Sequence, residues 1–99
     1  MNGLTALADP TRQSIVKMLA SGALSSGDIA RRFAMSAPAV SQHLKTLRDA
    51  GLVKVRAEAQ KRIYELDPDG VSAVADWVND LRKFWANKLD ALEAELMKP

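Results

Sequence analysis

The chain contains no cysteine. This absence excludes disulfide bonds, thiolate metal sites and thiol redox switches within these 99 residues. No apolar run approaches the length of a membrane span, and the first residues lack the pattern of a signal peptide. We therefore expect a cytoplasmic protein that has no membrane partner.

Histidine is almost as scarce, because His43 is the only one. A catalytic histidine needs a nucleophile and an orienting acid within reach. Ser41 lies two positions away and points to a different side of a helix. No catalytic constellation or cofactor-binding loop is found elsewhere, so the sequence predicts neither an enzyme nor a bound cofactor.

Acidic side chains are scarce in the middle of the chain. Residues 31–62 carry a local charge of +6 whereas the whole chain carries +2, so the remaining residues carry −4. The basic members are Arg31, Arg32, Lys45, Arg48, Lys54, Arg56, Lys61 and Arg62. A basic centre between acidic ends is typical of a protein that binds a polyanion, and a solvated charged surface is the alternative interpretation.

The chain has no repeats or flexible linkers, and its 99 residues fit one domain. A chain this short buries its surface inefficiently, so we expect association to add stability. Asp9 and Pro10 open a first helix as cap and first residue, and Ser21-Gly22 ends it. Ser25 caps a second helix, with Asp28 three residues further on in a capping-box-like start.

A third helix is expected from Ser36 to about Ala50. Its apolar residues Val40, Leu44 and Leu47 recur at helical spacing and face the core. The opposite side then carries Ala37, Ser41, Gln42, Lys45 and Arg48. Residues 25–50 therefore read as a helix-turn-helix, whose second helix lies in the DNA major groove.

The wing is expected at about residues 53–66, where the apolar pattern changes to a period of two. The segment 57–61 between the two strands has no glycine, so we expect a longer, mobile loop rather than a tight turn. Basic residues near the tip would reach phosphates or a minor groove; they are Arg56, Lys61 and Arg62.

Pro68-Asp69-Gly70 is expected to break the second strand, and a long helix follows at about residues 70–97. Its apolar residues step by three and four, and the helix is roughly 40 Å long. We expect the first half to pack on the core of its own subunit and the turns from Phe84 onward to pair with a second copy. The candidate dimer contacts are Leu4, Leu7, Phe84, Trp85, Leu89, Leu92 and Leu96. Trp77, Phe84 and Trp85 either pack as core aromatics or line a ligand pocket between subunits.

Three strings of residues together resemble the ArsR-type winged-helix repressors. They are Ala8-Asp9-Pro10-Thr11-Arg12, Ser36 to Leu47, and Ala50-Gly51-Leu52-Val53, and the resemblance extends over nearly the whole chain. It implies a mainly α fold with a small β-hairpin, that is, a winged helix-turn-helix with a long C-terminal helix for dimerisation. It also implies a homodimer that binds a pseudo-palindromic operator, blocks transcription and is released by an inducing signal.

Metal-sensing members of that family carry a Cys-x-Cys pair before the recognition helix, and this sequence departs from them. The matching positions are Ser25 and Gly27, and the long helix has no histidine. A site made of carboxylates alone would favour hard ions and bind transition metals poorly. We therefore predict no metal site, and the inducing signal is left open.

The candidate DNA contacts come from three elements of the predicted domain. On the recognition helix, Gln42 is suited to adenine and Ser41 to any base pair, although either side chain can instead touch phosphate. Arg31 and Arg32 lie on the supporting helix, where one of them can pair with an acidic neighbour. The full set is Ser36, Ala37, Ala39, Val40, Ser41, Gln42, His43, Lys45, Arg31, Arg32, Arg56, Lys61 and Arg62.

The function predicted from these features is a sequence-specific, homodimeric transcriptional repressor that binds double-stranded operator DNA and regulates its own promoter. Two alternatives are a winged-helix module that acts mainly through another protein and a regulator with a small-molecule ligand at the dimer interface. The basic segment 31–62 argues against the protein-only module.

Overall fold

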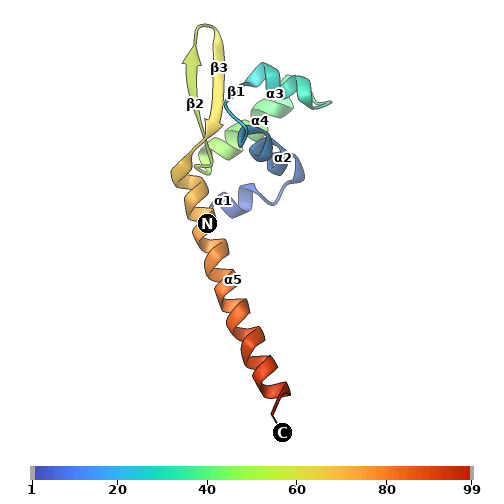
Figure 1. Ribbon diagram of the computed structural model, residues 1–99. Coiled ribbons are helices and arrows are strands. Elements are labelled where there is room, and N and C mark those ends of the chain that lie inside the picture. The colour runs from blue at the N-terminus through green and yellow to red at the C-terminus, as the bar shows by residue number, and fades with distance from the viewer. Residues whose placement is uncertain (1, 99) are drawn as a thin grey trace.

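The computed structural model describes residues 2–98. Figure 1 shows a cluster of short helices with a β-hairpin at one end and a long helix that leaves toward the opposite end. The elements are α1 (Asn2–Ala6), α2 (Pro10–Leu19), β1 (Leu24–Ser25), α3 (Ser26–Arg32), α4 (Ala37–Asp49), β2 (Val53–Glu58), β3 (Lys61–Leu66) and α5 (Pro68–Leu96). The fold is mainly helical with a small sheet, as the sequence predicts.

The helix starts are set by side chains that accept hydrogen bonds from free backbone N–H groups. Asp9 Oδ2 accepts from the N–H of Arg12 at 3.0 Å, and Pro10 stands first in α2. Ser25 Oγ accepts from the N–H of Asp28 at 3.1 Å and thereby caps α3. These two predicted starts are confirmed, because capping depends only on residues within one turn.

Three antiparallel strands form the sheet in the order β1-β3-β2. The prediction of a long, mobile wing loop is wrong, because Glu58 pairs with Lys61 and leaves a two-residue turn. Ala59 occupies this turn at φ 56°, a left-handed conformation that costs an L-residue roughly 1 kcal/mol. The continuous ladder of six pairs between β2 and β3 offsets that cost. The wing spans residues 53–66 as predicted, but its strands continue closer to the turn than expected.

The core lies where α2, α3 and α4 meet the base of the sheet. Its fully buried side chains include Ile15, Ile29, Leu44 and Leu47. The buried residues of α4 recur at helical spacing, which confirms that its apolar face points inward. The core therefore fixes the direction in which the opposite face of α4 points.

Two glycines allow α5 to begin directly against the end of α4. Gly51 has φ 79°, a conformation favoured by glycine, and turns the chain from α4 into β2. A Cβ atom at Gly70 would overlap the carbonyl oxygen of Gly51. The strand β3 ends at Leu66, just before Pro68-Asp69-Gly70, as predicted, and these three residues form the first turn of α5 behind the Asp67 cap.

Most of α5 lies outside the core. Only Val71 and Val74 pack partly against it, and no residue of α5 is buried. The prediction that the first half of this helix packs on its own subunit is therefore wrong beyond its first two turns, since Trp77 is already 45% exposed. Nor are Phe84 and Trp85 core aromatics within this chain, because both are more than half exposed.

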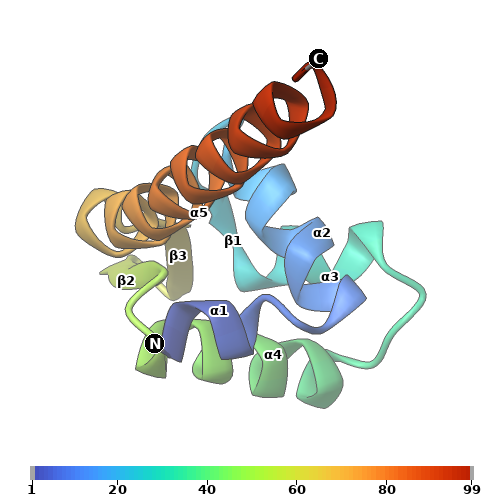
Figure 2. The same ribbon diagram turned by 90° about the horizontal axis from the view of Figure 1, so that it is seen from below.

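The molecule measures 70 × 26 × 22 Å, and its radius of gyration is 18.3 Å. A compact domain of this length has a radius of gyration of about 13 Å, and the projecting α5 accounts for the difference. The short helix α1 and the strand β1 were not predicted from sequence. Figure 2 shows α1 beside α4, and α1 also contacts α5. No helix within residues 2–98 is long and apolar enough to cross a membrane.

Candidate nucleic-acid interface

Helix α4 is held by its buried side and presents the opposite side to solvent. Ser36 Oγ accepts from the N–H of Ala39 at 3.3 Å and begins the helix, with Pro38 tolerated in its first turn. The exposed side chains follow at intervals of three or four residues, beginning at Ala37 and ending at Arg48. This is the face that the sequence predicts for reading DNA.

Two polar side chains on this face are free to bind another molecule. Neither Ser41 nor Gln42 forms a side-chain hydrogen bond with any residue in the range 2–98, and both are exposed. Thr46 differs, because its hydroxyl donates to the Gln42 carbonyl at 3.1 Å. Lys45 lies beside Ser41 and Gln42 on the helix and pairs loosely with Asp49 at 3.7 Å across solvent.

Val40 was included among the candidate DNA contacts, and the structure corrects this. Its side chain is 2% exposed and lies in the core between Leu44 and the neighbouring helices. The residue therefore supports the reading face from behind and does not contact DNA itself. Ala37 and Ala39 keep their place near the start of the helix, where Ala37 is exposed and Ala39 half-buried.

His43 lies at the edge of this face, and its ring is 20% exposed. Its Nδ1 atom is 3.4 Å from Nη1 of Arg12 and 3.9 Å from Oδ2 of Asp9. The backbone N–H of Arg12, followed by the charge of its guanidinium, lowers the pKa of the Asp9 carboxyl, although burial opposes the shift. The sequence signalled Asp9 as a cap and Arg12 as part of a family string, but not that the two meet His43.

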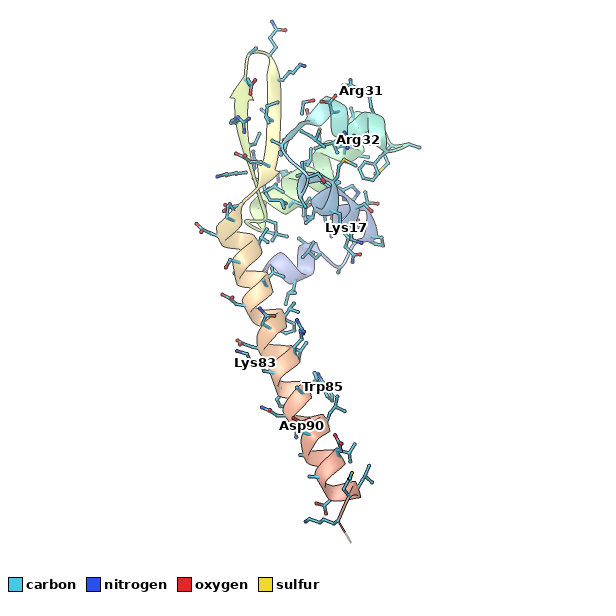
Figure 3. All side chains as sticks on the ribbon, in the orientation of Figure 1. Lys17, Arg31, Arg32, Lys83, Trp85 and Asp90 are labelled. Carbon is cyan, nitrogen blue, oxygen red and sulfur yellow. The ribbon has the colours of Figure 1, made fainter. Side chains whose placement is uncertain are left out.

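The supporting helix α3 carries two arginines in different settings, both labelled in Figure 3. Arg31 pairs with Asp28, one helical turn earlier. The hydroxyl of Ser25 and the Arg31 guanidinium lower the pKa of the Asp28 carboxyl. Arg32 has no carboxylate partner within the described residues, so its charge is the more available of the two.

The wing carries its basic residues in two groups. Arg56 lies between two carboxylates, 3.6 Å from Glu58 and 3.3 Å from Glu65. Lys61 and Arg62 stand next to the turn and are exposed. Together with residues at the start of α3, they line a hollow of about 460 Å³. The tip of the wing, rather than Arg56, therefore presents the available positive charge.

Comparison with known proteins places this arrangement in a family. The family described as "Bacterial regulatory protein, arsR family" matches residues 9–55, which contain the helix-turn-helix and the start of the first wing strand. The HTH-type transcriptional regulator Rv2034 of Mycobacterium tuberculosis is 49% identical over 84 residues, which cover 85% of this chain and 76% of that protein. The chain belongs to the ArsR family. It is therefore a DNA-binding transcriptional regulator with a winged helix-turn-helix, and not an enzyme.

Further ArsR-type relatives agree with this assignment. The transcriptional repressor SdpR of Bacillus subtilis is 32% identical over 77 residues, covering 78% of this chain and 86% of that protein. A solved structure described as a possible transcriptional regulator for arsenical resistance matches with a TM-score of 0.78 at 36% identity. It covers 99% of both chains, so the likeness includes the long helix α5.

The positions where metal-sensing ArsR proteins place cysteines are occupied by other groups here. Ser25 Oγ is engaged in capping α3, and Gly27 has no side chain. Within residues 2–98, no three His, Cys, Asp or Glu side chains gather closely enough to hold a metal ion.

Proposed function

We propose that this ArsR-family chain is a homodimeric repressor that binds a pseudo-palindromic operator in its own promoter region. Each subunit places α4 in a major groove, and the two grooves lie about 34 Å apart on one face of the duplex. The observation that carries the proposal is the exposed face of α4, where Ser41 and Gln42, whose side chains have no partner among the described residues, lie beside Lys45. Such a protein works in the cytoplasm, where bacterial DNA is found.

The division of labour between phosphate and base contacts follows from the charges described above. Arg32, Lys61 and Arg62 are suited to phosphates, which position the protein on the duplex. Gln42 is suited to the N6 and N7 atoms of adenine, and Ser41 to any base pair. Arg56 contributes less than its charge suggests, because Glu58 and Glu65 already neutralise it.

The proposed dimer rests on the apolar stripe of α5, which one subunit leaves open. Trp85 is 56% exposed and Leu96 is 76% exposed. Contiguous apolar surfaces of this kind mark interfaces in soluble proteins. Figure 3 shows Trp85 on one side of α5 and Lys83 and Asp90 on the other, so a second copy has one apolar side to cover. Leu4 of α1 and Leu7 of the α1–α2 turn are half-buried, and we include both in the proposed interface.

The test is footprinting of the protein on the promoter region of its own gene, at moderate salt and with random competitor DNA. We expect two protected half-sites with centres about 10 base pairs apart, because each subunit reads one turn of the duplex. Equal affinity for all sequences, or a single protected half-site at saturation, would count against the proposal. A promoter fusion in cells then checks repression, since deleting the gene should raise expression.

A matched pair of wing variants tests the phosphate contacts. Lys61→Ala should weaken binding uniformly across sequences and reduce the salt slope by about one. Arg56→Ala removes the same charge from the same wing and should change the slope less, because its carboxylate partners remain. A slope that is unchanged in Lys61→Ala would remove this lysine from the interface.

A further inference from the structure

The Asp-Pro-Thr-Arg string is part of the family resemblance, and the function described so far gives Arg12 no role. Its guanidinium nevertheless joins three helices. Nε donates to the carbonyl of Ala6 at 2.6 Å, at the end of α1, and Nη1 lies 3.4 Å from Nδ1 of His43 on α4. The side chain also lines a hollow of about 260 Å³ between α1 and the back of α4.

The direction of these hydrogen bonds determines the state of the imidazole. A guanidinium can only donate, so Nδ1 of His43 accepts and the hydrogen of the neutral ring is on Nε2. Asp9 approaches the same Nδ1 at 3.9 Å, beyond hydrogen-bond distance, and its Oδ2 already accepts from the Arg12 backbone. Arg12 is therefore the group that selects the tautomer.

The Nε2 atom of His43 must lie at the surface. It has no hydrogen-bond partner in residues 2–98, and the described side chains include no buried nitrogen or oxygen that lacks a partner. An unpartnered Nε2 is consistent with both facts only if solvent reaches it. The ring thus has one nitrogen held inside by Arg12 and one N–H presented at the edge of the reading face of α4.

We propose that Arg12 is a positioning residue for DNA recognition. It holds the ring of His43 against the end of α1 and keeps it in the tautomer that offers Nε2–H to a phosphate of the duplex. This inference rests on the proposed function, because it needs α4 in the major groove. It adds a residue that does not touch DNA and that links α1 to the reading helix.

Gln13 provides a matched control for the role of Arg12. Its Nε2 donates to the Leu7 carbonyl at 2.7 Å, so it also ties the end of α1 to α2, but it forms no hydrogen bond with α4 within residues 2–98. Gln13→Met therefore loosens the α1 attachment alone, whereas Arg12→Met loosens it and releases His43. Lys17→Met controls for the loss of a positive charge from α2. The Lys17 side chain is exposed and has no ion pair within residues 2–98 (Figure 3).

The first experiment measures affinity for the footprinted operator as a function of salt. We expect Arg12→Met to weaken binding about tenfold, the effect of losing one charge-assisted hydrogen bond. The salt slope should stay unchanged, because Arg12 neutralises no phosphate. The two controls should stay within about twofold of the natural protein. A salt slope that is shallower by about one in Arg12→Met would show that Arg12 contacts a phosphate. An equal loss of affinity in Gln13→Met would show that only the attachment of α1 matters. Either result overturns the proposal.

The second experiment is a double-mutant cycle with His43→Leu. If Arg12 acts through His43, Arg12→Met should have little further effect on operator affinity once the imidazole is gone. Additive losses in the double variant would show that the two residues act independently and would overturn the proposal. Thermal unfolding of all four proteins checks that the compared species are folded.

The third experiment needs no variant, because His43 is the only histidine and gives the only imidazole nitrogen signals in an NMR spectrum. We expect the neutral ring of the natural protein to be the Nε2–H tautomer. A spectrum dominated by Nδ1–H would overturn the role of Arg12 even if every Arg12 variant failed to fold. If the natural protein binds no DNA selectively, the proposed function is refuted. The NMR measurement of the tautomer does not depend on DNA binding and still tests the contact between Arg12 and His43.

Discussion

We call residues 2–66 the head and α5 from Trp77 onward the tail. The head and the tail contain the same apolar residue types, but these are buried in the head and exposed in the tail. Leu44 and Leu47 in the head are 0% exposed, whereas Leu89 is 60% exposed and Leu96 is 76% exposed. The head therefore completes its core within one chain, and α5 does not. The difference separates folding from association: one set of leucines stabilises the subunit, and the other is available to a second copy.

The largest expected effect is a loss of dimer affinity caused by a change in the tail. Trp85→Asp should weaken the proposed dimer at least about a thousandfold, because a carboxylate would be buried without a partner. Lys83→Ala changes the charge by the same amount on the opposite side of α5 and serves as the control (Figure 3). Sedimentation equilibrium measures both, and a dimer of normal affinity in Trp85→Asp would refute this interface.

One chemical change made in both regions sharpens the contrast. Leu44→Ala should lower the free energy of unfolding by about 2–5 kcal/mol at every protein concentration, because it opens a cavity in the core. Leu89→Ala should lower stability only through weaker association, so its effect should depend on concentration. Urea denaturation at several concentrations distinguishes the two, and parallel behaviour would erase the division between head and tail.

The junction between the two regions is tested at Gly70. In Gly70→Ala the added Cβ overlaps the carbonyl oxygen of Gly51, so α5 has to shift away from the head at a cost of about 1–3 kcal/mol. In Gly27→Ala the nearest atom lies 3.6 Å from the added Cβ, an ordinary contact, and the domain should be unharmed. Thermal unfolding compares the two variants, and equal melting temperatures would show that the junction tolerates movement.

We expect the selectivity for DNA sequence to depend on residues of the head and not on residues of the tail. Gln42→Ala should change selectivity by about 1–3 kcal/mol at one base pair if the amide bonds adenine, and leave the dimer intact. Affinities for an operator series with single substitutions provide the measurement. Uniform weakening on all sequences would assign Gln42 to phosphate instead.

The smallest expected effect is a pH dependence confined to the head. The Asp9 carboxyl has a pKa below its ordinary value of 3.8, so its contribution to stability is present above that pH and is lost as the pH falls through the lower, folded-state value. Asp9→Asn should therefore flatten the loss of stability on acidification. Asp90→Asn makes the same change on α5, where no described residue donates to the carboxylate. Identical pH profiles for the two variants would contradict the prediction.

The sequence predicted the elements that local chemistry determines. Capping by Asp9 and Ser25 and the spacing of Val40, Leu44 and Leu47 depend on neighbours within one or two turns. Helix α1 was missed because its first residues have weak helical signals and Arg12 and Gln13 hold its end from α2. Such support comes from tertiary contacts that no local pattern contains.

The candidate site divides in the same way. The exposed face of α4 follows from helical periodicity, so Ser41, Gln42 and Lys45 were placed correctly on the exposed side of the helix. The pairing of Arg56 with Glu65 depends on the register between β2 and β3. Turn propensity alone predicted a longer loop, so the sequence did not predict this register. The meeting of Arg12 and His43 joins residues 31 positions apart, which only the packed structure brings together.

Because no residue of α5 is buried in a single subunit, the concentration of the protein itself determines how often this helix is covered by a second copy. An isolated helix of about a dozen residues is only marginally stable in water, so we expect the far end of α5 to fray in solution when a subunit has no partner. A frayed end is a substrate for proteases, and pairing protects it. If the chain forms the proposed dimer, a cell that makes little of this protein clears single subunits, and a cell that makes more of it accumulates the paired form that the proposed repression requires.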